Sequence, residues 1–316
     1  MTVCTQTLFE FPAANRRRVQ ASFTGGDVSS DGGLVLLRQV DRRLQMTRTL
    51  AQRLPDPRDP TKITHPLVTF LRQRVFGLCQ GYEDLNDHDR LRTDVALQTA
   101  VEQAGDLASA ATLCRWENAA DRAAAWTVHQ WWLEQFIASH ASAPAELVLD
   151  LDATDDPLHG QQEGAFFHGY YGQYCFLPLY VFCGERLLVA YLRPSNIDVA
   201  RHAWAVVALL VKRLRQAWPQ VKIVVRGDSG FCRWRMLRWC DRHAVQYIVG
   251  LAKNARLLAL AEPLIEQAAQ QYAQTQQKQR LFGELQYAAQ TWEQARRVIV
   301  KAEHTNKGRN PRFVVT

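Results

Sequence analysis

Two groups of aspartates follow apolar runs of this chain, and their spacing could serve metal-dependent chemistry. Asp150 and Asp152 close the run LVLDLD, and residues two apart on a strand face the same side of a sheet. Asp228 follows a second run, VVRGDSGF, between Gly227 and Gly230. Ligands of open α/β sheets gather at the carboxyl ends of strands, so we expect these carboxylates to meet at one edge of a sheet.

Carboxylates held close together repel each other unless a cation lies between them. Hard oxygen ligands without a His–Cys cluster favour Mg²⁺, with Mn²⁺ as the alternative. Two such ions can activate a nucleophile and stabilise the leaving oxygen in phosphodiester displacement. The residues alone leave two interpretations open, a metal site or ordinary turns and helix caps.

The residues that follow the first run carry further polar groups. Asp155 and Asp156 precede Pro157, which is typical of a turn, with a metal contact as the alternative. His159, Gln161 and Gln162 follow in HGQQEG. For these three residues the sequence leaves a lining of the active site and a plain loop equally open.

Positive charge is concentrated in one stretch of the chain. The 316 residues carry a formal charge of +7, and residues 201–242 hold ten Lys or Arg against two Asp. This pattern indicates a surface that follows nucleic-acid phosphates, with solvated helix faces as the alternative. The candidate DNA contacts are Arg226, Arg233, Lys212, Arg213, Arg215 and Lys253, and the cluster Arg16–Arg18 is a further candidate.

Several classes of protein are excluded by composition. Seven cysteines without a C-x-x-C pair suit neither a disulfide framework nor a zinc ribbon. The longest apolar run is too short to cross a bilayer, and the first residues lack the pattern of a secretory signal. We therefore expect a soluble, cytoplasmic protein with reduced thiols.

The elements that must position these residues change in kind near residue 145. Residues 1–144 predict a mainly helical domain after a strand at VQASF, with a helix at 33–44 capped by Ser30 or Asp31. We expect Asp84 or Asn86 to cap a further helix. This domain is our candidate for recognising DNA ends, by analogy only.

Residues 145–255 predict three strands, then a helix, a strand, a helix and a strand, which indicates an α/β fold with a mixed sheet covered by helices. FLPLYVFCG and RLLVAYLR form a hairpin that turns at Gly184–Glu185, and Asp198 can cap the helix that ends near Ala217. Residues 256–316 predict a Gln-rich helix and further strands. The spacing of Trp234 and Trp239 is more typical of core residues than of a base-stacking surface.

Several long motifs resemble one family. LDLDATDDPLHGQQEGAFFHGYYGQYCFLPLYVFCG, LLVAYLRPSNIDVARHAW, VVRGDSGFCRWRMLRWC, TGGDVSSDGGL and LRQRVFGLCQGYEDLNDHDRLR are similar to DDE transposases of bacterial insertion sequences, specifically the insertion sequence 1380 family. The resemblance covers essentially the whole chain. It implies an RNase H-like core, with the first catalytic Asp on the central strand and the second after the fourth strand.

The resemblance assigns roles to individual residues. Asp152 takes the first catalytic role, with Asp150 as the second candidate on the same face, and Asp228 takes the other. All three are candidate ligands of Mg²⁺ or Mn²⁺. The implied partners are DNA, as terminal inverted repeats and target, and a second copy of the chain when two element ends are brought together; the implied location is the bacterial nucleoid.

The sequence departs from the family in one respect. The family places a third carboxylate on a later helix, in a context similar to Y-x-x-R-x-x-x-E, and no such stretch occurs here. Glu262, Glu266, Glu284, Glu293 and Glu303 lie in the segment expected before that helix. We therefore expect a truncated chain without nuclease activity. The alternatives are a non-catalytic DNA-binding fragment and a metal-dependent nuclease on the same fold.

Overall fold

The structure, a computed structural model, describes residues 8–14, 17–22, 29–160, 162–164 and 166–316. The roles predicted for Gln161 and Arg16 concern positions outside these ranges. The chain forms two compact units, residues 1–131 and 132–316. Among the described helices, none combines the length and apolarity needed to cross a bilayer.

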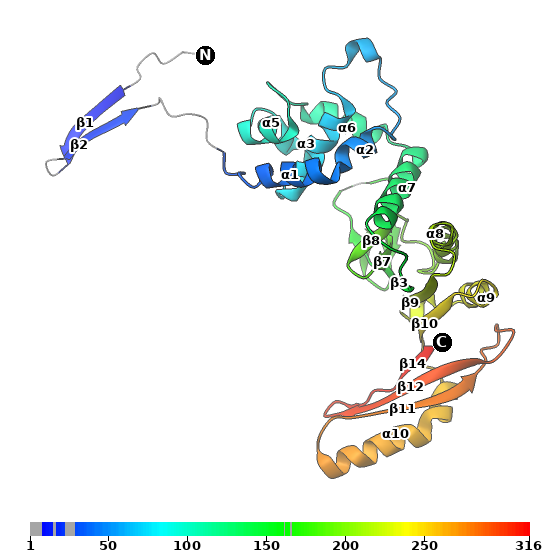
Figure 1. Ribbon diagram of the computed structural model, residues 1–316. Coiled ribbons are helices and arrows are strands. Elements are labelled where there is room, and N and C mark those ends of the chain that lie inside the picture. Colours follow the sequence, from blue (N-terminus) through cyan, green and yellow to red (C-terminus); the bar gives the residue numbers. More distant parts are fainter. Residues whose placement is uncertain (1–7, 15–16, 23–28, 161, 165) are drawn as a thin grey trace. The chain divides into compact units, whose positions relative to one another are not determined.

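The first unit is mainly helical, as the sequence predicts (Figure 1). It begins with an antiparallel pair of strands, which includes part of the predicted strand at VQASF. Its elements are β1 (Leu8–Ala14), β2 (Arg17–Ser22), α1 (Leu34–Leu44), α2 (Met46–Ala51), η1 (Pro60–Lys62), α3 (Leu67–Cys79), η2 (Leu85–Asp87), α4 (His88–Leu91), α5 (Val95–Val101) and α6 (Ala110–Asn118), with α7 (Arg122–Ala138) continuing into the second unit.

Capping in this unit follows the predictions only in part. Asp84 accepts a hydrogen bond from the backbone N–H of Asn86 and caps η2, which confirms that prediction. The N-cap of α1 is Gly33, without a side-chain hydrogen bond. The predicted cap by Ser30 or Asp31 is therefore wrong, because Asp31 instead accepts a hydrogen bond from the Tyr82 hydroxyl at 2.9 Å.

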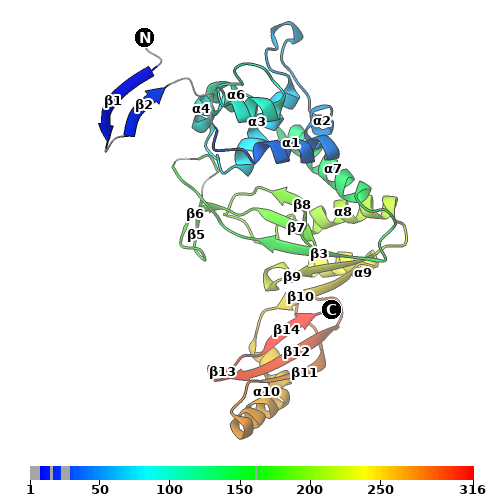
Figure 2. The same ribbon diagram turned by 60° about the vertical axis from the view of Figure 1, so that its left-hand side comes forward.

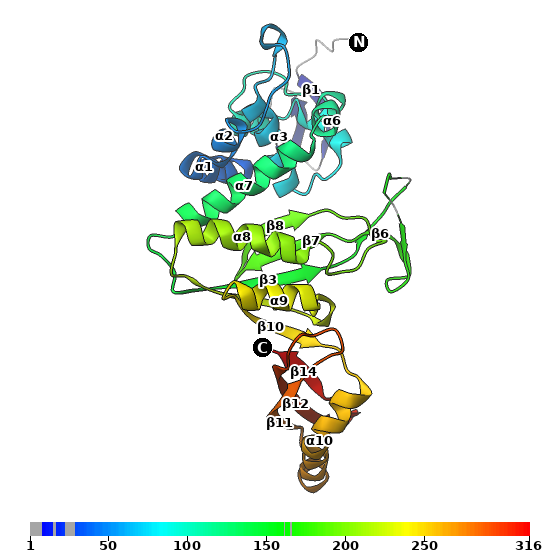
Figure 3. The ribbon, with the colours of Figure 1, turned by 90° about the vertical axis from the view of Figure 1, so that its right-hand side faces the viewer.

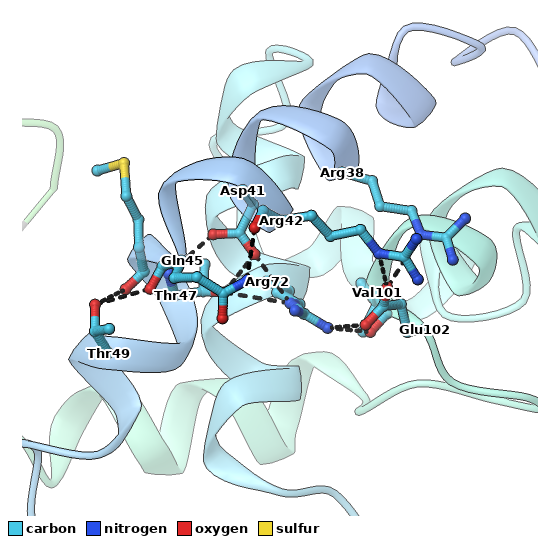
Figure 4. A network of polar contacts seen from close by, with 10 residues as sticks. Arg38, Asp41, Arg42, Gln45, Thr47, Thr49, Arg72, Val101 and Glu102 are labelled. Atoms are coloured by element: carbon cyan, nitrogen blue, oxygen red, sulfur yellow. Dashed lines mark hydrogen bonds and ion pairs between the residues drawn. The ribbon is translucent and has the colours of Figure 1, made fainter.

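An ion-pair network around the buried side chains of Arg72 and Asp41 holds α1, α2 and α3 together (Figure 4). Arg72, only 7% exposed, donates to Asp41 at 3.2 Å and to Glu102 at 2.7 Å. Asp41 also accepts hydrogen bonds from the backbone and the hydroxyl of Thr47. Burial raises the pKa of Glu102, but hydrogen bonds from Arg72 and Arg42 outweigh it and lower the pKa to about 2. Each buried charge is therefore paired, as a low-dielectric interior requires.

The second unit is built on a nine-stranded mixed sheet (Figures 1 and 2). Its elements are β3 (Glu146–Ala153), β4 (Asp156–Pro157), β5 (Phe166–His168), β6 (Gln173–Phe176), β7 (Leu179–Cys183), β8 (Arg186–Tyr191), α8 (Ala203–Ala217), β9 (Lys222–Gly227), η3 (Ser229–Phe231), α9 (Trp234–Arg242), β10 (Gln246–Leu251), α10 (Ala255–Thr275), β11 (Gln279–Tyr287), β12 (Arg296–Thr305), β13 (Gly308–Arg309) and β14 (Arg312–Val315). This order confirms the predicted mixed α/β arrangement.

In the sheet, β3 lies between β7 and β9. The order is β8, β7, β3, β9, β10, β14, β12 and β11. β7 is antiparallel to both β3 and β8, whereas β9 and β10 run parallel to β3. The predicted hairpin is confirmed, and Gly184 turns it with a φ of +59° that favours glycine. Beyond β10, the antiparallel strands β14, β12 and β11 extend the same sheet.

The two faces of the sheet differ in chemistry. Leu147, Leu149 and Leu151 point into a core that also contains buried residues of α8, α9 and α10. Figure 3 shows α8 and α9 in front of the strands on this covered side. Because side chains alternate along a strand, Asp150 and Asp152 lie on the opposite face. Helix packing on one side thus turns the aspartates toward solvent on the other.

The helix start at α8 differs from the prediction. The N-cap is His202 in a left-handed conformation, without a side-chain hydrogen bond, so the predicted cap by Asp198 is wrong. Asp198 instead accepts a hydrogen bond from the backbone N–H of Ala200 and forms an ion pair with Arg233 at 2.8 Å. These partners engage the carboxylate before the helix begins.

Candidate active site

The register between β3 and β9 brings the two predicted aspartates to one edge of the sheet. Residue pairs run from Glu146 opposite Lys222 to Asp150 opposite Arg226, with one constant offset. Extending this register by two residues sets Asp228 opposite Asp152. Asp228 follows the end of β9 with extended backbone, φ −75° and ψ −175°. Neighbouring strands lie about 5 Å apart, so the two backbones are close enough for both carboxylates to reach one ion.

Asp152 occupies an exposed position at the end of the central strand. It lies opposite Tyr180 of β7 and is followed by Asp155, which accepts a hydrogen bond from the Gln173 side chain. Burial raises the pKa of Tyr171, and the negative charges of Asp155 and Asp152 add to this effect. A concentration of negative charge therefore exists at this edge.

A tight turn fixes the backbone at Asp228. Its Oδ1 accepts a hydrogen bond from the backbone N–H of Gly230 at 2.8 Å and caps η3, which is the kind of turn that the sequence left open as the alternative to a metal site. Gly250 of β10 lies against this turn. A Cβ at position 250 would meet Ser229 N at 2.8 Å and the carbonyl carbon of Asp228 at 3.1 Å. Only glycine permits this close approach, so Gly250 positions Asp228.

Asp150, the second candidate ligand, is already paired. Arg226 on the neighbouring strand forms a two-pronged ion pair with it, in which Nη2 donates to Oδ2 at 2.8 Å. This hydrogen bond raises the pKa of Arg226. The pair compensates the charge of Asp150 and leaves Asp152 as the exposed carboxylate of the strand's end.

The other predicted DNA contacts fall into two groups. Arg213 forms a bidentate ion pair with Glu134 at 2.6 Å, and Arg215 donates to the backbone carbonyls of His243 and Ala244. Arg226 and Arg233 are paired as described above. Lys212 and Lys253 are exposed, and in the part of the chain that the structure describes neither makes an ion pair. These two lysines therefore carry uncompensated charge.

The connection from β3 to β7 contains features that the sequence interpretation missed. It forms a small three-stranded sheet of β4, β6 and β5, with Asp156 in β4 and His159 exposed beyond it. Phe167, Tyr170 and Tyr174 are exposed, Tyr170 by 86%. The available signal was the aromatic run FFHGYYGQY, which has no alternation that would bury one side.

Most of the glutamates after residue 255 form ion pairs with nearby arginines or lysines. Glu262, Glu284 and Glu293 form ion pairs with Arg309, Arg297 and Arg238. Glu303 is buried and forms ion pairs with Lys278, Arg280 and Lys301. The hydrogen bond from Lys278 is the largest cause that lowers the pKa of Glu303 to about 2, and it outweighs burial, which raises the pKa. Across the described ranges, no group of three His, Cys, Asp or Glu could hold a metal ion. The absence of a third ligand among these glutamates stays a prediction.

The donor set at Asp152 and Asp228 suits one class of ion. Mg²⁺ is commonly held by one or two carboxylates together with water and substrate phosphates. Two exposed carboxylates on adjacent strand ends meet that requirement. Of the two oxygens of Asp228, Oδ1 accepts the hydrogen bond from the Gly230 N–H.

The predicted core role holds for Trp239 and not for Trp234. Trp239 is partly buried and packs against the core, while its ring also borders a hollow at the surface of α8 and α9. Trp234 lines the same hollow and is not part of the core. On α7, Trp131 and Phe136 are buried. Helical spacing identified the tryptophans but could not tell whether a neighbouring element fills the space beside them.

Comparison with known proteins places the chain in a family. Residues 11–316 match the family described as transposase DDE domain group 1. The chain belongs to this family. None of the curated proteins compared with it matches.

Two solved structures resemble this chain of the transposase family with low sequence identity and low TM-scores. The cryo-EM structure of the piggyBac transposase synaptic complex with hairpin DNA is 7% identical, with a TM-score of 0.42, over 89% of this chain and 60% of that chain. The Mos1 transposase paired-end complex with left transposon end is 9% identical, with a TM-score of 0.24, over 71% of this chain and 69% of that chain.

Proposed function

We propose that this chain is part of a DNA transposase in which Asp152 and Asp228 hold a divalent cation that serves phosphodiester cleavage and strand transfer. The observation that carries the proposal is the shared register of the two aspartates at the ends of adjacent parallel strands. Family membership over residues 11–316 supports the same reaction class. We assign the chain to the insertion sequence 1380 group on the motifs it resembles.

The topology supports an RNase H-like core. In such a core the first three strands are antiparallel neighbours, and the fourth and fifth lie parallel to the first on its other side. β3, β7, β8, β9 and β10 have this arrangement. Asp152 then lies on the central strand and Asp228 directly after the fourth, which are the positions implied for the first two catalytic carboxylates.

Mg²⁺ or Mn²⁺ bound at this edge would polarise a phosphoryl oxygen and favour the departure of the leaving oxygen. The protein's own part is to hold the two carboxylates. Gly250 admits the turn that carries Asp228, and the pair with Arg226 compensates the charge of Asp150. Asp152 and Asp228 are thereby the two ligands that this face presents.

We propose that Lys212 and Lys253 supply the first phosphate contacts. Both are exposed, and Lys253 follows the end of β10, which is parallel to β3 and β9, so it lies at the same edge as the aspartates. Arg226, Arg233, Arg213 and Arg215 can reach phosphate only by giving up the partners described above. Terminal repeats and target DNA are the proposed ligands, and a second copy of the chain is the proposed partner on bringing two DNA ends together.

The test measures metal binding and DNA binding separately. Mn²⁺ titration followed by the electron paramagnetic resonance of the free ion should show a site in the wild type that weakens about tenfold or more in Asp152→Asn and in Asp228→Asn. Asp106→Asn is the matched control, because Asp106 is an exposed aspartate of the first unit paired with Arg92. It should leave Mn²⁺ affinity unchanged.

DNA binding should survive in the same variants. Phosphate-contacting cations supply most of the affinity for DNA, so both aspartate variants should bind duplex DNA as tightly as the wild type in the absence of the ion. Equal Mn²⁺ affinity in the wild type and both variants would refute the metal site. Loss of DNA binding in these variants alone would contradict the roles assigned to the two aspartates.

A further inference from the structure

A hollow of about 220 Å³ opens on the surface of the second unit, on α8 and α9. We name it the Trp–Arg hollow. It is lined by Trp204, Trp234, Trp239, Arg235, Arg238, Arg242 and His243. Ligand sites for drug-sized molecules usually occupy about 300–1,000 Å³, so this hollow suits a single flat ring system.

The walls of the hollow combine flat apolar surfaces with cations. The guanidinium groups of Arg235 and Arg238 lie 5.4 Å and 5.9 Å from the centre of the Trp234 ring. Trp239 stacks on His243 with ring centres 4.5 Å apart and an angle of 18° between the planes. Trp204 is 43% exposed. Indole faces offer stacking area to a nucleobase, and arginines beside them offer charge to its phosphate.

Arg238, which lines the hollow, is held by one ion pair and has one enclosed donor. Arg238 forms an ion pair with Glu293 through Nη1 at 2.8 Å. Its Nε is buried, and within the described ranges it has no hydrogen-bond partner. Because this atom is closed to solvent, the charge that Arg238 offers to a ligand is that of its guanidinium group as a whole.

The two helices that line the hollow, α8 and α9, follow strands of the central sheet. β8 and β9 both run parallel to β3, and α8 and α9 follow their ends. Trp204 and Trp234 lie in the first turns of these two helices. Both helices lie on the covered side of the sheet, so the hollow is a surface separate from the face that carries Asp152.

We propose that the Trp–Arg hollow binds an unpaired nucleobase of a DNA strand, stacked on an indole ring and held through its phosphate by the arginines. The inference rests on the proposed function and specifies the DNA that it recognises: DNA with a base outside the duplex. Charge favours nucleic acid over a protein segment as the occupant, because residues 201–242 hold ten Lys or Arg against two Asp.

The test compares two DNA molecules of the same sequence, one fully paired and one with a single unpaired 2-aminopurine. Anisotropy should show that the full chain binds the second about tenfold more tightly, and 2-aminopurine fluorescence should be quenched by stacking. Trp204→Leu and Trp234→Leu should each reduce this preference to below about twofold while leaving affinity for paired DNA unchanged. Trp126→Leu, at an exposed tryptophan of the first unit, should retain the full preference.

Arg238→Gln keeps the proposal testable if a tryptophan variant fails to fold, since it should also reduce the preference without touching an indole. Equal wild-type affinity for the two DNA molecules overturns the inference but leaves the proposed function standing. Failure to bind even paired DNA refutes the proposed function itself. Self-association that Trp234→Leu abolishes, with the DNA preference intact, would assign the hollow to a second copy and overturn the inference.

Discussion

Replacing Arg226 with glutamine should strengthen metal binding at Asp152 and Asp228. The change removes the partner of Asp150 and leaves an uncompensated carboxylate on the face that carries Asp152. A strand rises about 3.3 Å per residue, so Asp150 lies about 7 Å from an ion held beside Asp152. The added charge therefore acts on the ion at short range.

The size of the effect follows from Coulomb's law. A single negative charge about 7 Å from a divalent cation contributes about 1.2 kcal/mol at the dielectric constant of water. The Asp150 side chain is 28% exposed, so we use the dielectric constant of water, which gives a lower bound on the interaction energy. We expect Arg226→Gln to tighten Mn²⁺ binding about sevenfold at low ionic strength, where the screening length is about 30 Å.

Arg213→Gln is the matched control for this prediction. It breaks an ion pair of the same kind and frees Glu134, but that pair lies between α7 and α8 on the covered side of the sheet. Mn²⁺ affinity should change less than twofold in this variant. An Arg226→Gln variant that gains less than twofold, or that gains no more than Arg213→Gln, would refute the assignment of the ion to this edge.

Three further predictions follow from individual contacts. Gly250→Ala should weaken Mn²⁺ binding at least tenfold by Mn²⁺ titration, because its Cβ would displace the backbone of the turn at 2.8 Å. Lys212→Gln and Lys253→Gln should each lower the slope of log K against log salt by about 0.9 in duplex-binding assays. Burial raises the pKa of Glu102, but hydrogen bonds from Arg72 and its neighbours lower it to about 2, so the stabilisation that its ionised form contributes holds above pH 4.5 and is lost as pH falls through 2. Urea midpoints followed by circular dichroism should show this loss in the wild type and not in Glu102→Gln.

The sequence was sufficient for the central strands and for placing Asp152 and Asp228 at strand ends, while their role as metal ligands stays a prediction. Long apolar runs bounded by Gly and Asp gave the strands, and alternation gave the face that Asp150 and Asp152 share. The partner of Asp150 was not predictable, because the pair with Arg226 depends on a register set by two strands 76 positions apart. Gly250 carried a signal that went unused, since a glycine inside a strand often marks the close approach of another backbone.

Local rules failed where a distant residue offered a better partner. Asp198 has the position of a helix cap, but Arg233, which follows in the chain after β9, takes its carboxylate. The tryptophans of α9 have helical spacing, yet Trp234 lies at the open hollow. Spacing within one helix does not predict whether a neighbouring element packs over a given side chain. Capping and periodicity describe one element at a time, whereas both outcomes depend on how elements pack.

Arg226 links the two halves of the proposed chemistry. The guanidinium can pair with Asp150 or with a DNA phosphate, and a bidentate contact to either uses the same donors. If phosphate takes Arg226, Asp150 is freed beside Asp152 and the ion binds more tightly. Linkage then requires the ion to favour DNA binding by the same factor. Duplex DNA should therefore tighten Mn²⁺ binding in the wild type beyond any effect in Arg226→Gln, in which Asp150 is already free; an equal gain in both proteins would show that Arg226 does not couple DNA to the metal.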